Sequence, residues 1–480
     1  MHNRGDILLV SCYELGHPPF GVALLAGFLE KVGFFPDTID ISVDPLSNEK
    51  LCRAKLVGIS VPMHTALRIG VKVAEQARKL NPSCKIAFFG LYAALNADYL
   101  CENLADFVIG GEVEEAFVQR VQSLAGDKAP SARMVSALRL HSIATPLRTT
   151  LPPLSKYAQL EKNEMRYLAG YVEASRGCRH LCRHCPIPPV YGGRFTIIPE
   201  EILLEDIAAQ IALGAEHITF GDPDFLNGPN HSLKIVRQMH KKFPAVTFDF
   251  TAKIEHLLQH KNLLPEFSAL GCIFIISAVE SLNGTVLRYL DKGHTPTDVI
   301  KAIKIVHGNG MALRPSLVPF TPWETLDSYL DLFDFVEHYQ MIDHIDPIQY
   351  TVRLLIPPGS LLLSEAAMTP YLGPIIQESF SYQWKHPDPR MDTLQKQVSR
   401  AVEQRVGTTS TADIFYRLKE CAIGMAEGRS MVHLSLDTLF LQPQRGLSSS
   451  PKGAPPPRMT EQWFCCSEPT EKQIKCLELE

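Results

Sequence analysis

The sequence lacks several features that would place it in other classes of protein. It has no apolar run long enough for an export signal or a membrane span, since a short apolar stretch follows the polar residues 1–6. Its formal net charge of −5 lacks the basic excess of a protein that coats nucleic acid. Its 12 cysteines show no disulfide-scaffold spacing. We therefore expect a cytoplasmic protein that needs neither membrane nor nucleic acid.

The bulk composition is that of a globular protein. Of the residues, 45% are apolar and 21% are charged. A chain of 480 residues has room for two or three domains of ordinary size.

The most informative stretch is a group of three cysteines. Cys178, Cys182 and Cys185 have the spacing C-x3-C-x2-C and follow the short apolar run 171–174. A loop this short can bring three thiolates to three corners of one iron–sulfur cube. Such cubes usually take four cysteine ligands. The next cysteine is Cys272, so we expect one iron to remain open to a substrate or cofactor.

Two other interpretations remain open on these residues alone. A structural zinc site normally has four protein ligands, and His180 or His184 can complete one here. The chain can also be an iron–sulfur binding or electron-transfer protein, although a carrier is expected to close all four iron sites. A zinc-stabilised scaffold and a cluster-bearing carrier are therefore the alternatives to an enzyme.

The motif Ser175-Arg-Gly-Cys178, with the two later cysteines, resembles the radical SAM superfamily. The resemblance implies a 4Fe–4S cluster whose open iron binds S-adenosylmethionine (SAM). It places His184 near the adenine, where the family usually has an aromatic residue. It also implies a reductant such as flavodoxin or ferredoxin and reductive cleavage of SAM to methionine and a 5′-deoxyadenosyl radical, which takes a hydrogen atom from the substrate. No motif indicates what the substrate is.

The N-terminal region, residues 1–128, alternates apolar runs with amphipathic segments. We predict strands at 7–10, 37–41, 56–61, 85–89 and 106–109, separated by helices, which indicates a parallel, Rossmann-like sheet covered on both faces. This pattern is similar to the cobalamin-binding domain of one radical SAM class. The usual Asp-x-His-x-x-Gly is absent, and the loop reads Ser11-Cys-Tyr-Glu-Leu-Gly-His17. The resemblance therefore leaves open whether cobalamin is bound and whether it carries a methyl group.

Residues 129–168 contain several prolines and are predicted to be a linker. Residues 169–395 then repeat a strand–helix pattern. Together with the strand before the cysteines, we predict strands at 217–220, 246–251, 272–279, 311–317 and 347–354. These elements predict the partial (β/α)6 barrel of the radical SAM fold, with the chemistry at the carboxyl ends of the strands.

Polar residues at those strand ends are the candidate cofactor-binding residues. The resemblance assigns Gly221, Asp222 and Asp224 to the amino group of SAM, and Arg314 to its carboxylate. It assigns the segment containing Ser277, Glu280 and Ser281 to the ribose and methionine portions. His256 and His344 are interpreted as surface or capping residues. The cofactor-binding candidates are His184, Gly221, Asp222, Asp224, Ser277, Glu280, Ser281 and Arg314.

The C-terminal region is predicted to be a helical extension at 396–440 and a flexible tail at 441–480. Residues 442–457 are rich in proline, glycine and serine. The tail then reads Cys465-Cys466-Ser-Glu-Pro469 and resembles the radical SAM family named for its Cys-Cys-Ala-Glu-Pro ending, with Ser467 as the departure. We hypothesise that Cys465 and Cys466 visit the active site as catalytic thiols.

Overall fold

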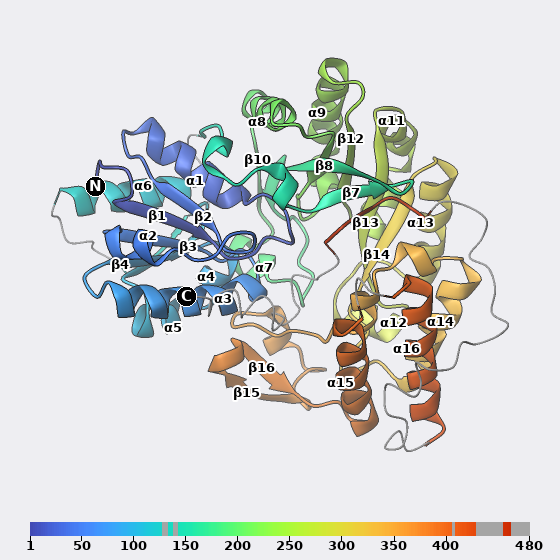
Figure 1. Cartoon of the computed structure of the whole chain (residues 1–480). Helices are drawn as coiled ribbons and strands as arrows, with labels where there is room; N and C mark the ends of the chain where they lie inside the picture. The colour runs from blue at the N-terminus through green and yellow to red at the C-terminus, as the bar shows by residue number, and fades with distance from the viewer. Residues whose placement is uncertain (127–132, 138–142, 406–408, 429–454, 462–480) are drawn as a thin grey trace.

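The computed structural model describes residues 1–126, 133–137, 143–405, 409–428 and 455–461. These residues form two α/β units that lie side by side, with further helices and a hairpin after the second unit (Figure 1). Across the described ranges, we find no helix with both the length and the apolar character that a membrane crossing requires.

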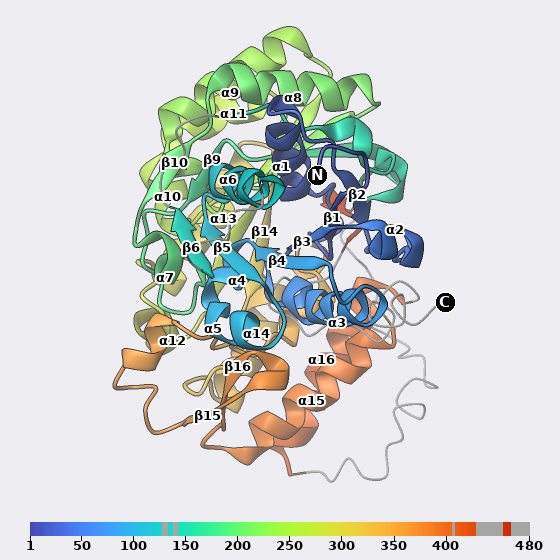
Figure 2. The same ribbon diagram turned by 90° about the vertical axis from the view of Figure 1, so that its left-hand side faces the viewer.

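The N-terminal unit is a parallel six-stranded sheet with the order β2-β1-β3-β4-β5-β6 (Figure 2). Its first and third strands are buried along their whole length, which explains their uninterrupted apolar runs. The order reverses between β1 and β3, so the carboxyl ends of these strands flank the switch point where such sheets bind ligands. The strands are β1 (Ile7–Ser11), β2 (Asp37–Asp40), β3 (Leu56–Ser60), β4 (Lys85–Phe89), β5 (Phe107–Gly111) and β6 (Met134–Ala137).

Helices cover both faces of this sheet, and alternate residues of each strand serve the two sides. One core joins α1 (Phe20–Lys31) and α6 (Glu114–Ala125) to residues such as Leu9 and Phe107. The other core joins the opposite strand residues to the remaining helices. Those helices are α2 (Asn48–Arg53), α3 (His64–Leu80), α4 (Leu91–Leu95) and α5 (Ala97–Asn103).

The second unit is built on a sheet with the order β14-β13-β12-β11-β8-β7-β17. The five strands from β14 to β8 in this order are parallel, and β7 and β17 extend the sheet beyond β8 in antiparallel fashion. The strands are β7 (Gln159–Lys162), β8 (Met165–Val172), β11 (His217–Phe220), β12 (Thr247–Thr251), β13 (Cys272–Glu280), β14 (Ala312–Leu317) and β17 (Arg458–Met459). The main outer helices are α8 (Glu200–Ala212), α9 (Pro229–Lys242), α11 (Leu264–Ala269), α13 (Pro296–Gly308) and α14 (Leu326–His338).

The predicted partial barrel is therefore confirmed, but its predicted last strand at 347–354 is wrong. That segment begins with the 3-10 helix η6 (Pro347–Tyr350), and only a single parallel bridge between Phe320 and Arg353 remains of the strand pairing. Pro347 has a fixed φ and no N–H, which suits the first turn of a helix better than a central strand.

The predicted linker also contributes more structure than we expected. Met134–Ala137 adds β6 to the first sheet, and Gln159–Lys162 adds β7 to the second. Between them, the buried Arg148 donates two hydrogen bonds to Asp206 of α8, at 2.8 and 2.7 Å, and one to the Tyr171 carbonyl oxygen at 2.7 Å. A buried ion pair thus fastens the linker to the second unit.

The C-terminal extension packs against the barrel. It consists of a hairpin, β15 (Leu372–Ile376) and β16 (Ser381–Trp384), followed by α15 (Pro389–Glu403) and α16 (Thr411–Ala426). Residues 455–461, which begin inside the segment predicted to be flexible, return to the barrel, where β17 pairs with β7. Backbone hydrogen bonding therefore orders this short part of the tail despite its composition.

We predict that the Arg148 pair contributes substantially to stability. Replacing Arg148 by Met leaves Asp206 buried and unpaired, which typically costs about 3–5 kcal/mol. Urea unfolding of both variants should show this loss for Arg148→Met. The control variant Arg166→Met breaks an exposed pair with Glu161, for which about 0–1 kcal/mol is typical. Equal losses of unfolding free energy in the two variants would contradict the stabilising role of the Arg148–Asp206 pair.

Candidate functional site

The cysteine loop follows β8 and a short strand, β9 (Ser175–Gly177), which pairs in antiparallel fashion with β10 (Phe195–Ile197). Gly177, next to Cys178, has φ +75°, and a Cβ there would lie 2.5 Å from the Arg194 carbonyl oxygen, so only glycine fits without strain. The loop closes with the Cys185 N–H donating to the Cys182 carbonyl oxygen at 3.1 Å. Cys178 and Cys182 are buried and Cys185 is half-buried.

Arg183, inside the loop, fastens it to the rest of the barrel. Its backbone N–H donates to the Leu290 carbonyl oxygen at 3.0 Å, and its guanidinium donates to the Tyr289 carbonyl oxygen at 3.2 Å. The same guanidinium forms an ion pair with Glu365 at 2.7 Å. These contacts hold the loop in place over the end of the second unit.

The three thiols fit a cube better than a single ion. In the residues that the structure describes, only His180, Asp224 and His256 gather three donor atoms within 4.8 Å of one another, and the cysteines do not. A tetrahedral zinc ion with bonds of about 2.3 Å needs closer sulfurs. Burial, together with the neighbouring Cys182 and Cys178, raises the pKa of Cys185 to about 12. Three adjacent thiolates therefore need a bound cation, which a cluster's iron supplies.

Cys272 is not a fourth ligand. It begins β13, whereas Glu280, which contacts His184 of the cysteine loop, ends that strand. At about 3.3 Å per residue, the two ends of β13 lie roughly 26 Å apart. The open iron inferred from the sequence is therefore consistent with the position of this cysteine.

A buried triad borders the cysteine loop. Glu280 accepts from Lys292 at 3.0 Å and lies 3.2 Å from His184 Nε2. Burial opposes its ionisation, but Lys292 and His184 lower the pKa of Glu280 to about 2. Burial also opposes the charge of Lys292, yet Glu280 and Cys182 raise its pKa. The site thus holds a permanent cation beside two of the cluster ligands.

Glu280 has an unusual backbone conformation at this position. Its φ of +66° is uncommon for a residue with a side chain, and such strain is typical of functional positions. His184 Nδ1 is buried and has no hydrogen-bond partner among the described residues, so this atom is available to a ligand. Sequence reasoning found His184 and Glu280 but missed Lys292, which carries no motif and comes into place only through the fold.

The Asp222 carboxylate already accepts hydrogen bonds from the segment that leads to the cysteines. It accepts from the Ala174 N–H at 2.8 Å and from the Ser175 hydroxyl at 2.6 Å. Burial raises its pKa to about 6, against these hydrogen bonds. At Gly221, a Cβ would lie 1.9 Å from the Tyr171 hydroxyl, so the close approach of β8 requires glycine. Both residues shape the start of the cysteine loop, and their contact with SAM stays a prediction.

Three other predicted residues also have protein partners. Ser277 donates to the Ala252 carbonyl oxygen at 2.7 Å, Ser281 donates to Glu324 at 2.8 Å, and Arg314 pairs with Asp346 at 2.8 Å. All three predicted residues are buried. Their role in binding SAM stays a prediction, and these contacts favour a supporting role. Cys465 and Cys466 lie outside the described residues.

Asp224 joins two histidines instead of standing alone. Its Oδ2 atom lies 2.7 Å from His256 Nδ1 and 3.8 Å from His180 Nε2. The interpretation of His256 as a surface or capping residue is wrong, since its side chain is only 3% exposed. Burial, then Lys253 and His256, lowers the pKa of His180 to about 4. The pairing of these two histidines with Asp224 was not predicted, because the three residues come from different segments of the barrel.

The N-terminal sheet offers a second cofactor site at its switch point. β1 and β3 end in Ser11 and Ser60, and β4 is followed by Gly90, whose φ is +106°. Small residues thus stand at the strand ends where such sheets bind ligands, and Glu14 Oε1 in the loop after β1 is buried without a hydrogen-bond partner in the described ranges. His17 packs against Tyr171 in a tilted ring contact, with ring centroids 4.8 Å apart. The residues fit cobalamin without His17 as an axial ligand.

One buried arginine brings the two sites together. Arg176, just before the cysteines, pairs with Glu112 at 2.9 Å and Glu114 at 2.7 Å, which follow β5 of the first sheet. It also pairs with Glu173 at 3.3 Å. The carboxyl edge of the first sheet and the cysteine loop are therefore adjacent.

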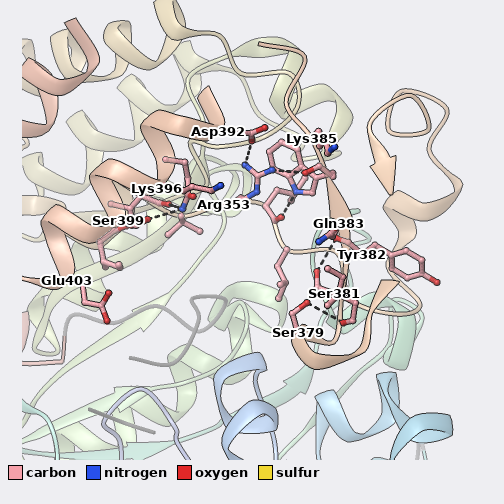
Figure 3. A pocket seen from close by; sticks show the side chains of 18 residues that line it. Arg353, Ser379, Ser381, Tyr382, Gln383, Lys385, Asp392, Lys396, Ser399 and Glu403 are labelled. Carbon is pink, nitrogen blue, oxygen red and sulfur yellow. Dashed lines mark hydrogen bonds and ion pairs between the residues drawn. The ribbon is translucent and has the colours of Figure 1, made fainter. Parts of the chain in front are cut away.

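A separate groove of about 750 Å³ lies between the barrel and the C-terminal extension (Figure 3). Arg353 lines this groove. Its guanidinium carbon lies 3.5 Å from the Trp384 ring centroid, and its guanidinium forms an ion pair with Asp392 at 2.7 Å. None of the described site residues named above lines it. Arg353 therefore stabilises the extension and does not belong to the cysteine site.

Comparison with known proteins supports both sites. Residues 172–336 match the radical SAM superfamily and residues 7–121 match the B12 binding domain. The fold resembles the cobalamin-dependent SAM radical enzyme OxsB with aqua-cobalamin bound, with a TM-score of 0.65, 13% identity, and coverage of 90% of this chain and 74% of that one. It also resembles the radical SAM methyltransferase TsrM from Kitasatospora setae, with a TM-score of 0.55, 14% identity, and coverage of 69% and 71%.

Curated relatives match this chain over only part of their own length. The hopanoid C-2 methylase of Rhodopseudomonas palustris is 21% identical over 55% of this chain and 51% of its own length. The bacteriochlorophyllide d C-12(1)-methyltransferase of Chlorobaculum tepidum is 23% identical over 48% and 49%. The tRNA-2-methylthio-N(6)-dimethylallyladenosine synthase of Desulfosudis oleivorans is 26% identical over 40% and 42%. The chain thus spans about half the length of these relatives or less.

We predict that each loop cysteine is needed to hold the cluster. In anaerobically reconstituted protein, Cys178→Ala, Cys182→Ala and Cys185→Ala should each lose most of the bound iron and sulfide, because a cube with two protein ligands is poorly held. The exposed Cys52 serves as the control, and Cys52→Ala should keep wild-type iron. Full iron content in a loop variant would contradict this assignment.

Proposed function

Because the chain belongs to the radical SAM superfamily and carries a B12-binding domain, we propose that it is a cobalamin-dependent methyltransferase. The observation that carries the proposal is the Arg176 junction, which sets the first sheet's ligand edge beside the cysteine loop. A methyl carrier at that edge would face the SAM-binding end of the barrel. The named methylases among the relatives favour the same reaction class.

The proposed cofactors divide between the two units. Cys178, Cys182 and Cys185 would hold the 4Fe–4S cluster and the small residues of the β1 and β3 ends would border cobalamin. When bound, the cluster supplies electrons for reductive cleavage of SAM, and cobalamin supplies a carrier for a methyl group. An external one-electron donor such as flavodoxin or ferredoxin would act as the reductant.

The chain's own residues would position SAM and keep water out. His184 Nδ1 is a buried atom free to bind the nucleoside part of SAM, and Glu280 holds the His184 ring through its Nε2 atom. Lys292 places a positive charge next to Cys182 and Cys185, which favours the more reduced, more negative state of the cluster. Asp222 fixes the start of the loop through Ala174 and Ser175.

The first test separates methyl transfer from radical chemistry alone. Holoprotein with cluster and cobalamin is given SAM and a reductant, and S-adenosylhomocysteine and 5′-deoxyadenosine are both measured. We expect S-adenosylhomocysteine, because giving up a methyl group converts SAM to this product. The control Cys182→Ala should form no 5′-deoxyadenosine. Production of 5′-deoxyadenosine alone would favour hydrogen abstraction without methyl transfer.

We further propose that the chain belongs to the family with the Cys-Cys-Ala-Glu-Pro ending and that Cys465 and Cys466 act at this site. The last described residue before them, Glu461, lies beside the loop after β1, since a Cβ on Gly16 would stand 2.9 Å from the Glu461 Cβ. The Thr460 N–H donates to the Gln159 carbonyl oxygen at 2.9 Å and secures this position. Four residues further along, Cys465 can reach about 14 Å from Glu461.

Cysteine labelling tests the tail. We expect the rate of alkylation of Cys465 and Cys466, measured by mass spectrometry, to fall when the cofactors are bound. The reason is that the two cysteines would then lie inside the cofactor site, away from the reagent. Cys476, in the same tail, is the internal control and should react at an unchanged rate. Equal protection at Cys476, or substrate turnover unaffected by Cys466→Ser, would count against the proposal.

A further inference from the structure

A second group of potential metal ligands borders the cysteine loop and is not needed to hold the cluster. His180 lies within the loop, Asp224 follows β11, and His256 belongs to α10 (Ile254–Gln259). One donor atom of each lies within 4.8 Å of the others. These residues come from three different segments of the barrel, so the fold gathers them at one point.

Two of the donor atoms are buried without a hydrogen-bond partner. Asp224 Oδ2 and His256 Nδ1 lie 2.7 Å apart as a histidine–carboxylate pair, but the contact lacks the geometry of a hydrogen bond, and neither atom has another hydrogen-bond partner among the described residues. The Asp224 side chain is fully buried and that of His256 is 3% exposed. A buried carboxylate oxygen that faces two histidines without a well-formed hydrogen bond is incompletely satisfied. A shared cation would satisfy both atoms.

The charges around the group favour such a cation. Asp224 and Glu255 contribute two negative charges, and Lys253 contributes one positive charge. Lys253 donates toward His180 Nδ1 at 3.1 Å and toward Glu255 at 3.2 Å. The other ring nitrogen, His180 Nε2, lies 3.1 Å from His256 Nε2 and 3.8 Å from Asp224 Oδ2, so this is the nitrogen that faces the group.

We propose that His180, Asp224 and His256 bind a divalent first-row transition-metal ion, separate from the iron–sulfur cluster. Two imidazole nitrogens and one carboxylate oxygen form a ligand set that suits such ions and leaves coordination positions open. The His180 side chain is 17% exposed, so the open positions face an accessible side. The bound ion would tie the cysteine loop to β11 and α10.

Mn²⁺ is the probe that best separates this site from the cysteines, because it prefers oxygen and nitrogen ligands over thiolates. It is titrated into full-length protein that carries the oxidised cluster and lacks cobalamin, and free Mn²⁺ is followed by its six-line electron paramagnetic resonance signal. We expect one bound Mn²⁺ per chain, with nitrogen hyperfine coupling from histidine. Zn²⁺ should displace it.

Variants test the ligands. His256→Gln and Asp224→Asn should weaken Mn²⁺ binding at least about tenfold, since loss even of an outer-shell partner costs 10–100-fold. His338→Ala, which removes a histidine of α14, should bind as the wild type does. Iron and sulfide are counted in every sample, so loss of the cluster and loss of this ion are distinguished. No bound Mn²⁺, no nitrogen coupling, or equal binding by His256→Gln would overturn the proposal.

Discussion

The ion cluster around Arg176 is the interaction on which the arrangement of the two units depends. The guanidinium of Arg176, a residue that is 9% exposed, pairs with Glu112 and Glu114 from the first unit and with Glu173 from the second. A buried charge is tolerated only when it is paired, and removing one partner of such a cluster is strongly destabilising. The position of Arg176, two residues before Cys178, couples the contact between the units to the course of the cysteine loop.

The site beyond this junction is organised by charge. Lys292 lies beside two of the three thiols and donates a hydrogen bond to Glu280. The backbone of Glu280 itself is in a strained conformation. On the other side of the loop, His180 contacts Lys253 and approaches Asp224. Lys292 and Lys253 therefore place positive charges near the loop, each beside a carboxylate, and both histidines of the loop have protein partners.

Several predicted site residues turn out to support the structure around the site. Asp222 holds the strand that leads to the cysteines, Ser277 joins β13 to the end of β12, and Arg314 pairs with Asp346. Their polar groups are satisfied within the protein, as buried polar groups usually are. Polar residues at strand ends can thus be conspicuous in a sequence because they bind a ligand or because they connect neighbouring loops.

The sequence by itself determined the parts that depend on local pattern. Five of the six strands of the first sheet and the five parallel strands of the second follow from their apolar runs, and the spacing of Cys178, Cys182 and Cys185 indicates the cluster. Only the tertiary structure decided the rest, including the replacement of the strand at 347–354 by a helical turn and the return of β17. Lys292, His256 and the partners of Arg176 could not be predicted, because their roles depend on contacts between segments far apart in the chain, and no local periodicity or spacing records such contacts.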